Sequence, residues 1–114
     1  MTPITTHVLD TSTGKPASGL AVTLEQETHE SGWQPLANGV TDNDGRIDNL
    51  MTSDTKFSAG SYRLTFETGA YFHMRQIECF FPQVTITFVV KDAGQHFHVP
   101  LLLSPFSYST YRGT

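Results

Sequence analysis

Four segments of the chain carry an apolar residue at every second position, and this period of two constrains the fold more than any other feature. The alternation runs through 20–25, 62–67, 84–90 and 97–103. Because successive side chains of a β-strand point to opposite faces, each segment predicts a strand with one apolar face. Four such faces are buried most simply when two sheets pack face to face. We therefore expect a β-sandwich.

Turn-forming residues separate these segments at intervals of roughly ten to twenty residues, a spacing typical of sandwiches. They include Thr13–Pro16, Asn38–Gly39, Asn43–Gly45, Ala59–Gly60 and Asp92–Gly94. The segment 68–76 departs from the alternation. It opens on a residue suited to capping, Thr68, and places Tyr71 and Met74 three positions apart, so it predicts one short helix. The fold class is therefore mostly β, with seven or eight strands and one helix. A last strand is expected to stop at the carboxyl terminus.

Length and charge exclude several classes of protein. With 114 residues we expect a single domain spanning 1–114. The net charge is −4 and there is no run of Lys or Arg, which argues against nucleic-acid binding. No apolar stretch is long enough to span a membrane, and we expect no signal peptide. The single cysteine, Cys79, cannot form an internal disulfide and is expected to be a packed thiol. We expect a cytoplasmic protein.

Two histidines are predicted on the outward faces of strands. Alternation within 3–10 and 95–103 directs His7 and His98 away from the core, together with Leu9 and Leu102. Apolar residues on such a face indicate that a second subunit covers it. Because histidine exchanges protons near neutral pH, the pair could activate water and protonate a leaving nitrogen. The alternative is two polar side chains on a hydrated sheet.

Two further arrangements are open from the residues alone. His7, His96 and His98 could form a catalytic zinc set, although the sequence locates no acidic partner for them. Arg46 follows the Asn43–Gly45 turn, where its guanidinium could bind an anionic oxygen in a bidentate manner or could simply be solvated.

Several segments, spread from the first strand to the last residue, resemble the 5-hydroxyisourate hydrolase family, the transthyretin-related proteins of urate breakdown. They are Ile4–Asp10 (ITTHVLD), Gly45–Arg46, Glu67–Phe72 (ETGAYF), His96–Pro105 (HFHVPLLLSP) and Tyr108–Thr114 (YSTYRGT). The last of these is similar to the family's tyrosine-arginine-glycine-serine terminus. The resemblance therefore covers essentially the whole chain.

The resemblance implies a fold, an assembly and a reaction. The fold would be the transthyretin-like β-sandwich of two four-stranded antiparallel sheets with one short helix. The family forms homotetramers, as dimers of dimers, with active sites where subunits meet, and it uses no metal or other cofactor. Its reaction is the hydrolysis of 5-hydroxyisourate to 2-oxo-4-hydroxy-4-carboxy-5-ureidoimidazoline, in which water attacks a cyclic amide carbonyl.

The resemblance also implies site residues. The family's catalytic residues match His7, Arg46 and His98, and substrate binding would involve His7 and Arg46 with the tail residues Tyr111, Arg112 and Thr114. Thr114 stands where the family has serine, which keeps the hydroxyl but adds a methyl group. The alternative function is a transthyretin-like carrier that binds a small molecule without catalysis. A carrier needs an open apolar channel, which His7, Arg46, His98 and Tyr111 would make polar and obstruct.

Overall fold

A computed structural model describes residues 3–30, 32–51 and 56–114, and this part of the chain contains nine strands and one helix. Their bounds are β1 (Ile4–Asp10), β2 (Lys15–Pro16), β3 (Ala21–Thr28), β4 (Gly32–Val40), β5 (Arg46–Ile47), β6 (Gly60–Phe66), α1 (Thr68–Met74), β7 (Val84–Val90), β8 (Phe97–Leu103) and β9 (Tyr108–Thr110).

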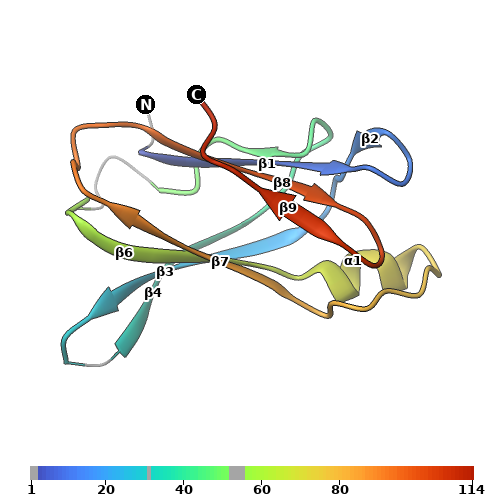
Figure 1. Ribbon diagram of the computed structural model, residues 1–114, viewed down its shortest axis with the longest axis horizontal. Coiled ribbons are helices and arrows are strands. Elements are labelled where there is room, and N and C mark those ends of the chain that lie inside the picture. The colour runs from blue at the N-terminus through green and yellow to red at the C-terminus, as the bar shows by residue number, and fades with distance from the viewer. Residues whose placement is uncertain (1–2, 31, 52–55) are drawn as a thin grey trace.

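The strands form two sheets that pack face to face, as Figure 1 shows, so the predicted sandwich is confirmed. One sheet has the order β4-β3-β6-β7 and is antiparallel throughout, as expected. The other has the order β2-β1-β8-β9, with β5 paired to β1 as a fifth strand. Within it, β1 and β8 run parallel, which differs from the expectation. These two strands are joined by most of the chain rather than by a hairpin, so nothing forces them to be antiparallel.

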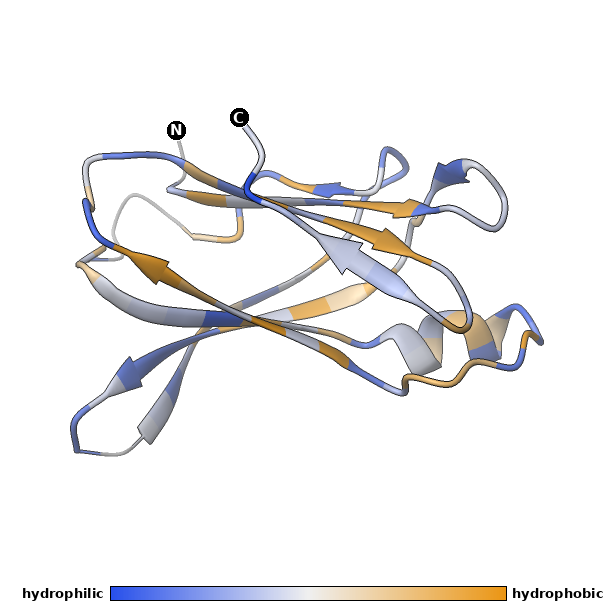
Figure 2. Cartoon of the chain, viewed as in Figure 1, coloured by the Kyte–Doolittle hydropathy of each residue, from blue (hydrophilic) through white to orange (hydrophobic). Residues whose placement is uncertain are grey.

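The apolar positions of the four alternating segments form the core between the sheets. Figure 2 shows apolar residues recurring along the strands of both layers. Leu24 on β3, Leu64 on β6 and Leu101 on β8 are fully buried, and Val84 on β7 nearly so. The predicted strand faces are therefore confirmed, and the outward faces named above lie on the opposite side of each strand.

The helix α1 is shorter than predicted and begins differently. It ends at Met74 because Gln76 adopts a left-handed conformation (φ 59°) that cannot continue a helix. Thr68 does not cap it: Glu67 holds the N-cap position, and the Thr68 hydroxyl instead donates to the Phe81 carbonyl at 2.7 Å. Met74 is 80% exposed and does not join Tyr71 in the core. In the described part of the chain, no helix has the length and apolar character that a membrane crossing needs.

Two features outside the regular elements were predicted from the sequence, the packed cysteine and the end of the chain. Cys79 packs against the core and its thiol donates to the Phe81 carbonyl, which confirms the packed thiol. The last strand stops at Thr110, before the terminus, contrary to expectation. Beyond it the tail crosses to β8, where Gly113 forms a single bridge with His98.

Candidate active site

Strand β5 brings Arg46 beside His7. β5 pairs with β1 in a register that sets Arg46 directly opposite His7. The turn before it is held by the Asp42 carboxylate, which accepts the backbone N–H of Arg46 at 3.0 Å. Gly45 completes the turn with φ +75°, and any β-carbon there would clash with the Val8 carbonyl oxygen. The turn residues thus position the backbone of Arg46, from which its side chain extends.

The parallel pairing of β1 with β8 places His98 near the same two residues. The register sets Thr5 beside His98 and His7 beside Pro100, so His7 and His98 project from the same outer face. The Thr5 hydroxyl oxygen lies 2.8 Å from Nδ1 of His98 and 3.0 Å from Nε2 of His96. His98 is therefore tied to β1 by a side-chain contact as well as by the strand ladder.

The electrostatic surroundings of His98 favour its neutral form. Partial burial lowers the pKa of His98 most, followed by the positive charge of Arg46 and then by His7 and His96, while Asp48 opposes them. The strand registers, which set Arg46 opposite His7 and His98 beside Thr5, place these groups on the same face of the sheet. A neutral imidazole can accept a proton from water.

The carboxyl-terminal tail covers one side of the His98 ring. The backbone N–H of Gly113 donates to the His98 carbonyl at 2.8 Å. A β-carbon on Gly113 would lie only 2.6 Å from Cδ2 of His98, so any other residue here would displace the ring or the tail. The tail and the ring are therefore in close contact, and a change in one displaces the other.

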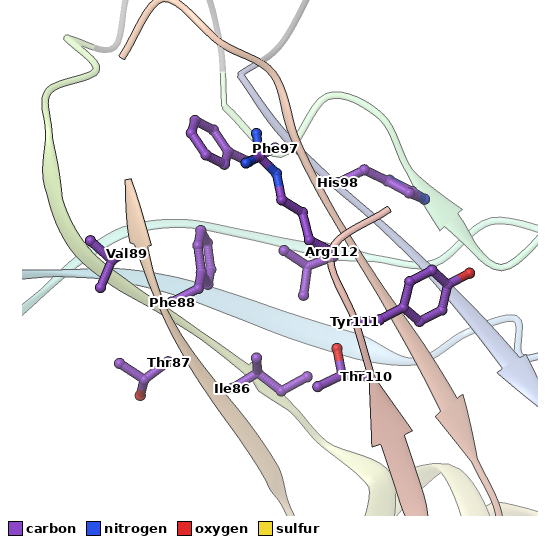
Figure 3. A pocket seen from close by; sticks show the side chains of 10 residues that line it. Ile86, Thr87, Phe88, Val89, Phe97, His98, Thr110, Tyr111 and Arg112 are labelled. Atoms are coloured by element: carbon purple, nitrogen blue, oxygen red, sulfur yellow. The ribbon is translucent and has the colours of Figure 1, made fainter. Parts of the chain in front are cut away.

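Tyr111 and Arg112 of the tail line a small cavity of about 240 Å³ between β7 and the tail. Figure 3 shows Phe88 and Val89 on one side of it, while the rings of His98 and Tyr111 extend away from them. The guanidinium of Arg112 lies 4.6 Å from the centre of the Phe97 ring and donates to Gln95. The cavity is mainly apolar, and of the proposed catalytic residues only His98 is among the residues that line it.

The structure brings His7, Arg46 and His98 together and places the tail against His98, whereas Arg112 is directed to Phe97. Thr114 is exposed at the chain end. The three-histidine zinc set is not formed: across residues 3–30, 32–51 and 56–114, no three metal-ligating side chains lie close enough to hold an ion. His96 instead contacts Thr5. Sequence reasoning missed Thr5 and the Gly113 contact, because both depend on the pairing of distant segments.

Comparisons with known proteins show which family the chain belongs to. The model of the HIUase/Transthyretin family matches residues 4–113. A 5-hydroxyisourate hydrolase of Salmonella dublin is 45% identical over 111 residues, covering 97% of this chain and 80% of the relative. The structure of Klebsiella pneumoniae 5-hydroxyisourate hydrolase is 43% identical with a TM-score of 0.85, covering 99% of this chain and all of that one. The structure of sea bream transthyretin in complex with thyroxine is 37% identical with a TM-score of 0.92, covering 99% of this chain and 96% of that one. The chain belongs to the HIUase/Transthyretin family.

Proposed function

We propose that this protein is a hydrolase that converts 5-hydroxyisourate to 2-oxo-4-hydroxy-4-carboxy-5-ureidoimidazoline in urate breakdown. The observation that carries the proposal is the convergence of His7, Arg46 and His98 on one outer sheet face. The relatives named 5-hydroxyisourate hydrolase, similar over nearly the whole chain, support the same activity. A carrier has no need for this set of proton-transfer groups beside a guanidinium.

The chemistry follows from the three side chains. A water oxygen forms a bond to the cyclic amide carbonyl carbon while one histidine takes a proton from that water. The carbon–nitrogen bond of the ring then breaks, and the other histidine, which must begin as the imidazolium cation, supplies the proton that the leaving nitrogen needs. The first histidine returns a proton to this second histidine after turnover. Arg46 stabilises the negative charge that develops on the carbonyl oxygen. Every proton is accounted for by the two imidazoles and the water, and we propose that the reaction requires neither a metal nor another cofactor.

The tail residues are proposed to shape the substrate site. Tyr111 is 59% exposed on the side of the tail to which His98 points, so it is placed to narrow the site around a flat ring. Arg112 and Thr114 would complete its wall once the tail meets the substrate. Arg112 would have to leave Gln95 to do so, whereas the Thr114 hydroxyl and carboxylate are already exposed.

We further propose a homotetramer, a dimer of dimers, in which subunit interfaces enclose the sites. His7 and His98 lie on a sheet face that bears the partly exposed Leu9 and Leu102. Apolar side chains are also exposed near the sheet edges formed by β7 and β9, including Val89 at 57% and Phe106 at 63%. A second copy that covers these surfaces would remove them from water. We also propose that residues 1–114 act as one domain in the cytoplasm, where Cys79 would stay reduced.

The activity is tested by making 5-hydroxyisourate in situ from urate with urate oxidase and following its ultraviolet decay. We expect the protein to accelerate the decay, and to do so equally after treatment with a chelator. Acceleration that disappears with the chelator and returns with a metal ion would contradict metal independence. Decay at the spontaneous rate, combined with saturable binding of a small apolar ligand, would favour the carrier function instead.

A further inference from the structure

Thr5 is a buried residue of β1 whose hydroxyl contacts two histidine rings at once. Its side chain shares the outer face of β1 with His7, yet the residue is only 8% exposed. The hydroxyl oxygen lies 2.8 Å from Nδ1 of His98 and 3.0 Å from Nε2 of His96, both distances of good hydrogen bonds. The hydroxyl therefore bridges the proposed catalytic histidine to a second imidazole.

A hydroxyl carries one proton, so it can donate to only one of these rings, and in the two arrangements that use this proton between the rings it accepts from the other ring. In the first arrangement, Nδ1–H of His98 donates to Thr5, and Thr5 donates to His96. In the second, Thr5 donates to Nδ1 of His98 and accepts from Nε2–H of His96. The two arrangements give neutral His98 opposite tautomers. In both, Nε2 is the ring nitrogen left for the substrate. Nε2 is a proton acceptor in the first arrangement and carries the proton in the second.

Only the first arrangement allows neutral His98 to transfer protons. There, Nε2 takes a proton from water, and the resulting imidazolium still donates from Nδ1 to Thr5 without any change in the hydroxyl. In the second arrangement, loss of the Nε2 proton would leave an imidazolate anion, which is far too basic to form near neutral pH. A neutral His98 that takes a proton from water through Nε2 must therefore have its own proton on Nδ1.

We propose that Thr5 is a positioning residue that accepts the Nδ1 proton of His98, donates to Nε2 of His96, and so presents Nε2 of His98 as the general base. The catalytic consequence rests on the proposed hydrolase function. The charged and titratable groups that face His98 are His7 on β1, Arg46 on β5, Asp48 just after β5, and His96 just before β8. With burial and Arg46 as the largest causes, they lower the pKa of His98 and keep the ring neutral, as the proposed role requires.

Two substitutions separate the hydroxyl from the shape of the side chain. Thr5→Val keeps the branched side chain but removes the hydroxyl, and Thr5→Ser keeps the hydroxyl. Thr23→Val, on the outer face of the other sheet, is the matched control. We expect Thr5→Val to lower kcat for 5-hydroxyisourate hydrolysis by roughly 10- to 100-fold with little change in KM, since a hydrogen bond to a charged ring is lost. Thr5→Ser should restore most of the rate, and Thr23→Val should match the wild type.

The pH profile and the tautomer provide readouts that a merely structural role would leave unchanged. In Thr5→Val, the imidazolium of His98 loses an acceptor, so the acid limb of kcat/KM should move to lower pH. Nitrogen-15 spectra of the histidine rings should show the wild-type His98 protonated on Nδ1. A Thr5→Val enzyme with wild-type kcat and pH profile, or a His98 ring protonated on Nε2, would overturn the proposal. If the wild type fails to hydrolyse 5-hydroxyisourate, the proposed function falls, and the spectrum alone still confirms or overturns the hydrogen-bond arrangement.

Discussion

The contact between the tail and the His98 ring makes Gly113→Ala an informative perturbation. The added β-carbon would lie 2.6 Å from Cδ2 of His98 and 3.2 Å from Cγ of Pro100, whereas ordinary contact begins at 3.4 Å. His98 and Pro100 belong to β8, which is paired on both sides with β1 and β9, so the strand itself cannot retreat. Either the ring rotates or the tail moves away, by about 0.8 Å in the tighter contact.

The displacement should affect catalysis far more than folding. A shift of this size at a reacting group costs up to about 100-fold in rate, so we expect kcat/KM for 5-hydroxyisourate to fall by roughly 10- to 100-fold. Stability should change by no more than about 1 kcal/mol, the worth of the single Gly113-to-His98 backbone hydrogen bond. The assay is the ultraviolet decay of 5-hydroxyisourate, with unfolding in urea measured in parallel.

Gly94→Ala is the matched control, because its β-carbon would meet only the end of the Asp92 side chain in an exposed turn. It should keep wild-type kinetics. A Gly113→Ala enzyme with wild-type kcat/KM would refute the reasoning, since it would mean that the tail can move without disturbing His98.

Three further predictions concern Tyr71 and His98. Tyr71→Phe removes the hydroxyl that donates to the buried Asp10 carboxylate at 2.9 Å. Burial, together with this hydrogen bond, raises the pKa of Tyr71 to about 12. We expect the free energy of unfolding in urea to fall by about 1–3 kcal/mol, against almost no loss for Tyr108→Phe at an exposed position. In an NMR titration, the midpoint of His98 should lie below 6.5 and rise in Arg46→Gln; a midpoint that does not rise would exclude the guanidinium as a cause. Because the folded chain then binds fewer protons than the unfolded chain, His98 should reduce stability as the pH falls below about 6.5, and His98→Asn should remove that contribution.

The parts of the fold that were predictable are those with a local signal. Alternation located the core faces of β3, β6, β7 and β8 because burial on one side of a strand imposes a period of two. The two-residue strands β2 and β5 are too short to show any period. The parallel pairing of β1 with β8 depends on contacts between residues about 93 positions apart, as in Thr5 and His98, and no local pattern reports such a pairing. The helix was located, but its cap was misassigned because Thr68 bonds to a distant carbonyl.

The same division applies to the candidate site. The outward direction of His7 and His98 follows from alternation alone, and the position of Arg46 directly after a turn follows from the Asn43–Gly45 segment. The proximity of these three residues cannot be predicted from the sequence, because it depends on β5 and β8 pairing with opposite sides of β1. Thr5 gives no chemical signal in the sequence, where it is one threonine among many, and only the sheet register shows that it contacts His98.

The most direct test of the proposed activity compares the wild type with His98→Asn in the 5-hydroxyisourate decay assay, with the assembly of both measured by sedimentation velocity. Asparagine is polar and smaller than histidine, and it cannot take up a proton near neutral pH. We expect the wild type to accelerate the decay, and His98→Asn to lose at least about 100-fold of that rate, as the removal of a general base requires, with its assembly unchanged. A correctly assembled His98→Asn protein that hydrolyses 5-hydroxyisourate as fast as the wild type would contradict the assignment of catalysis to this site.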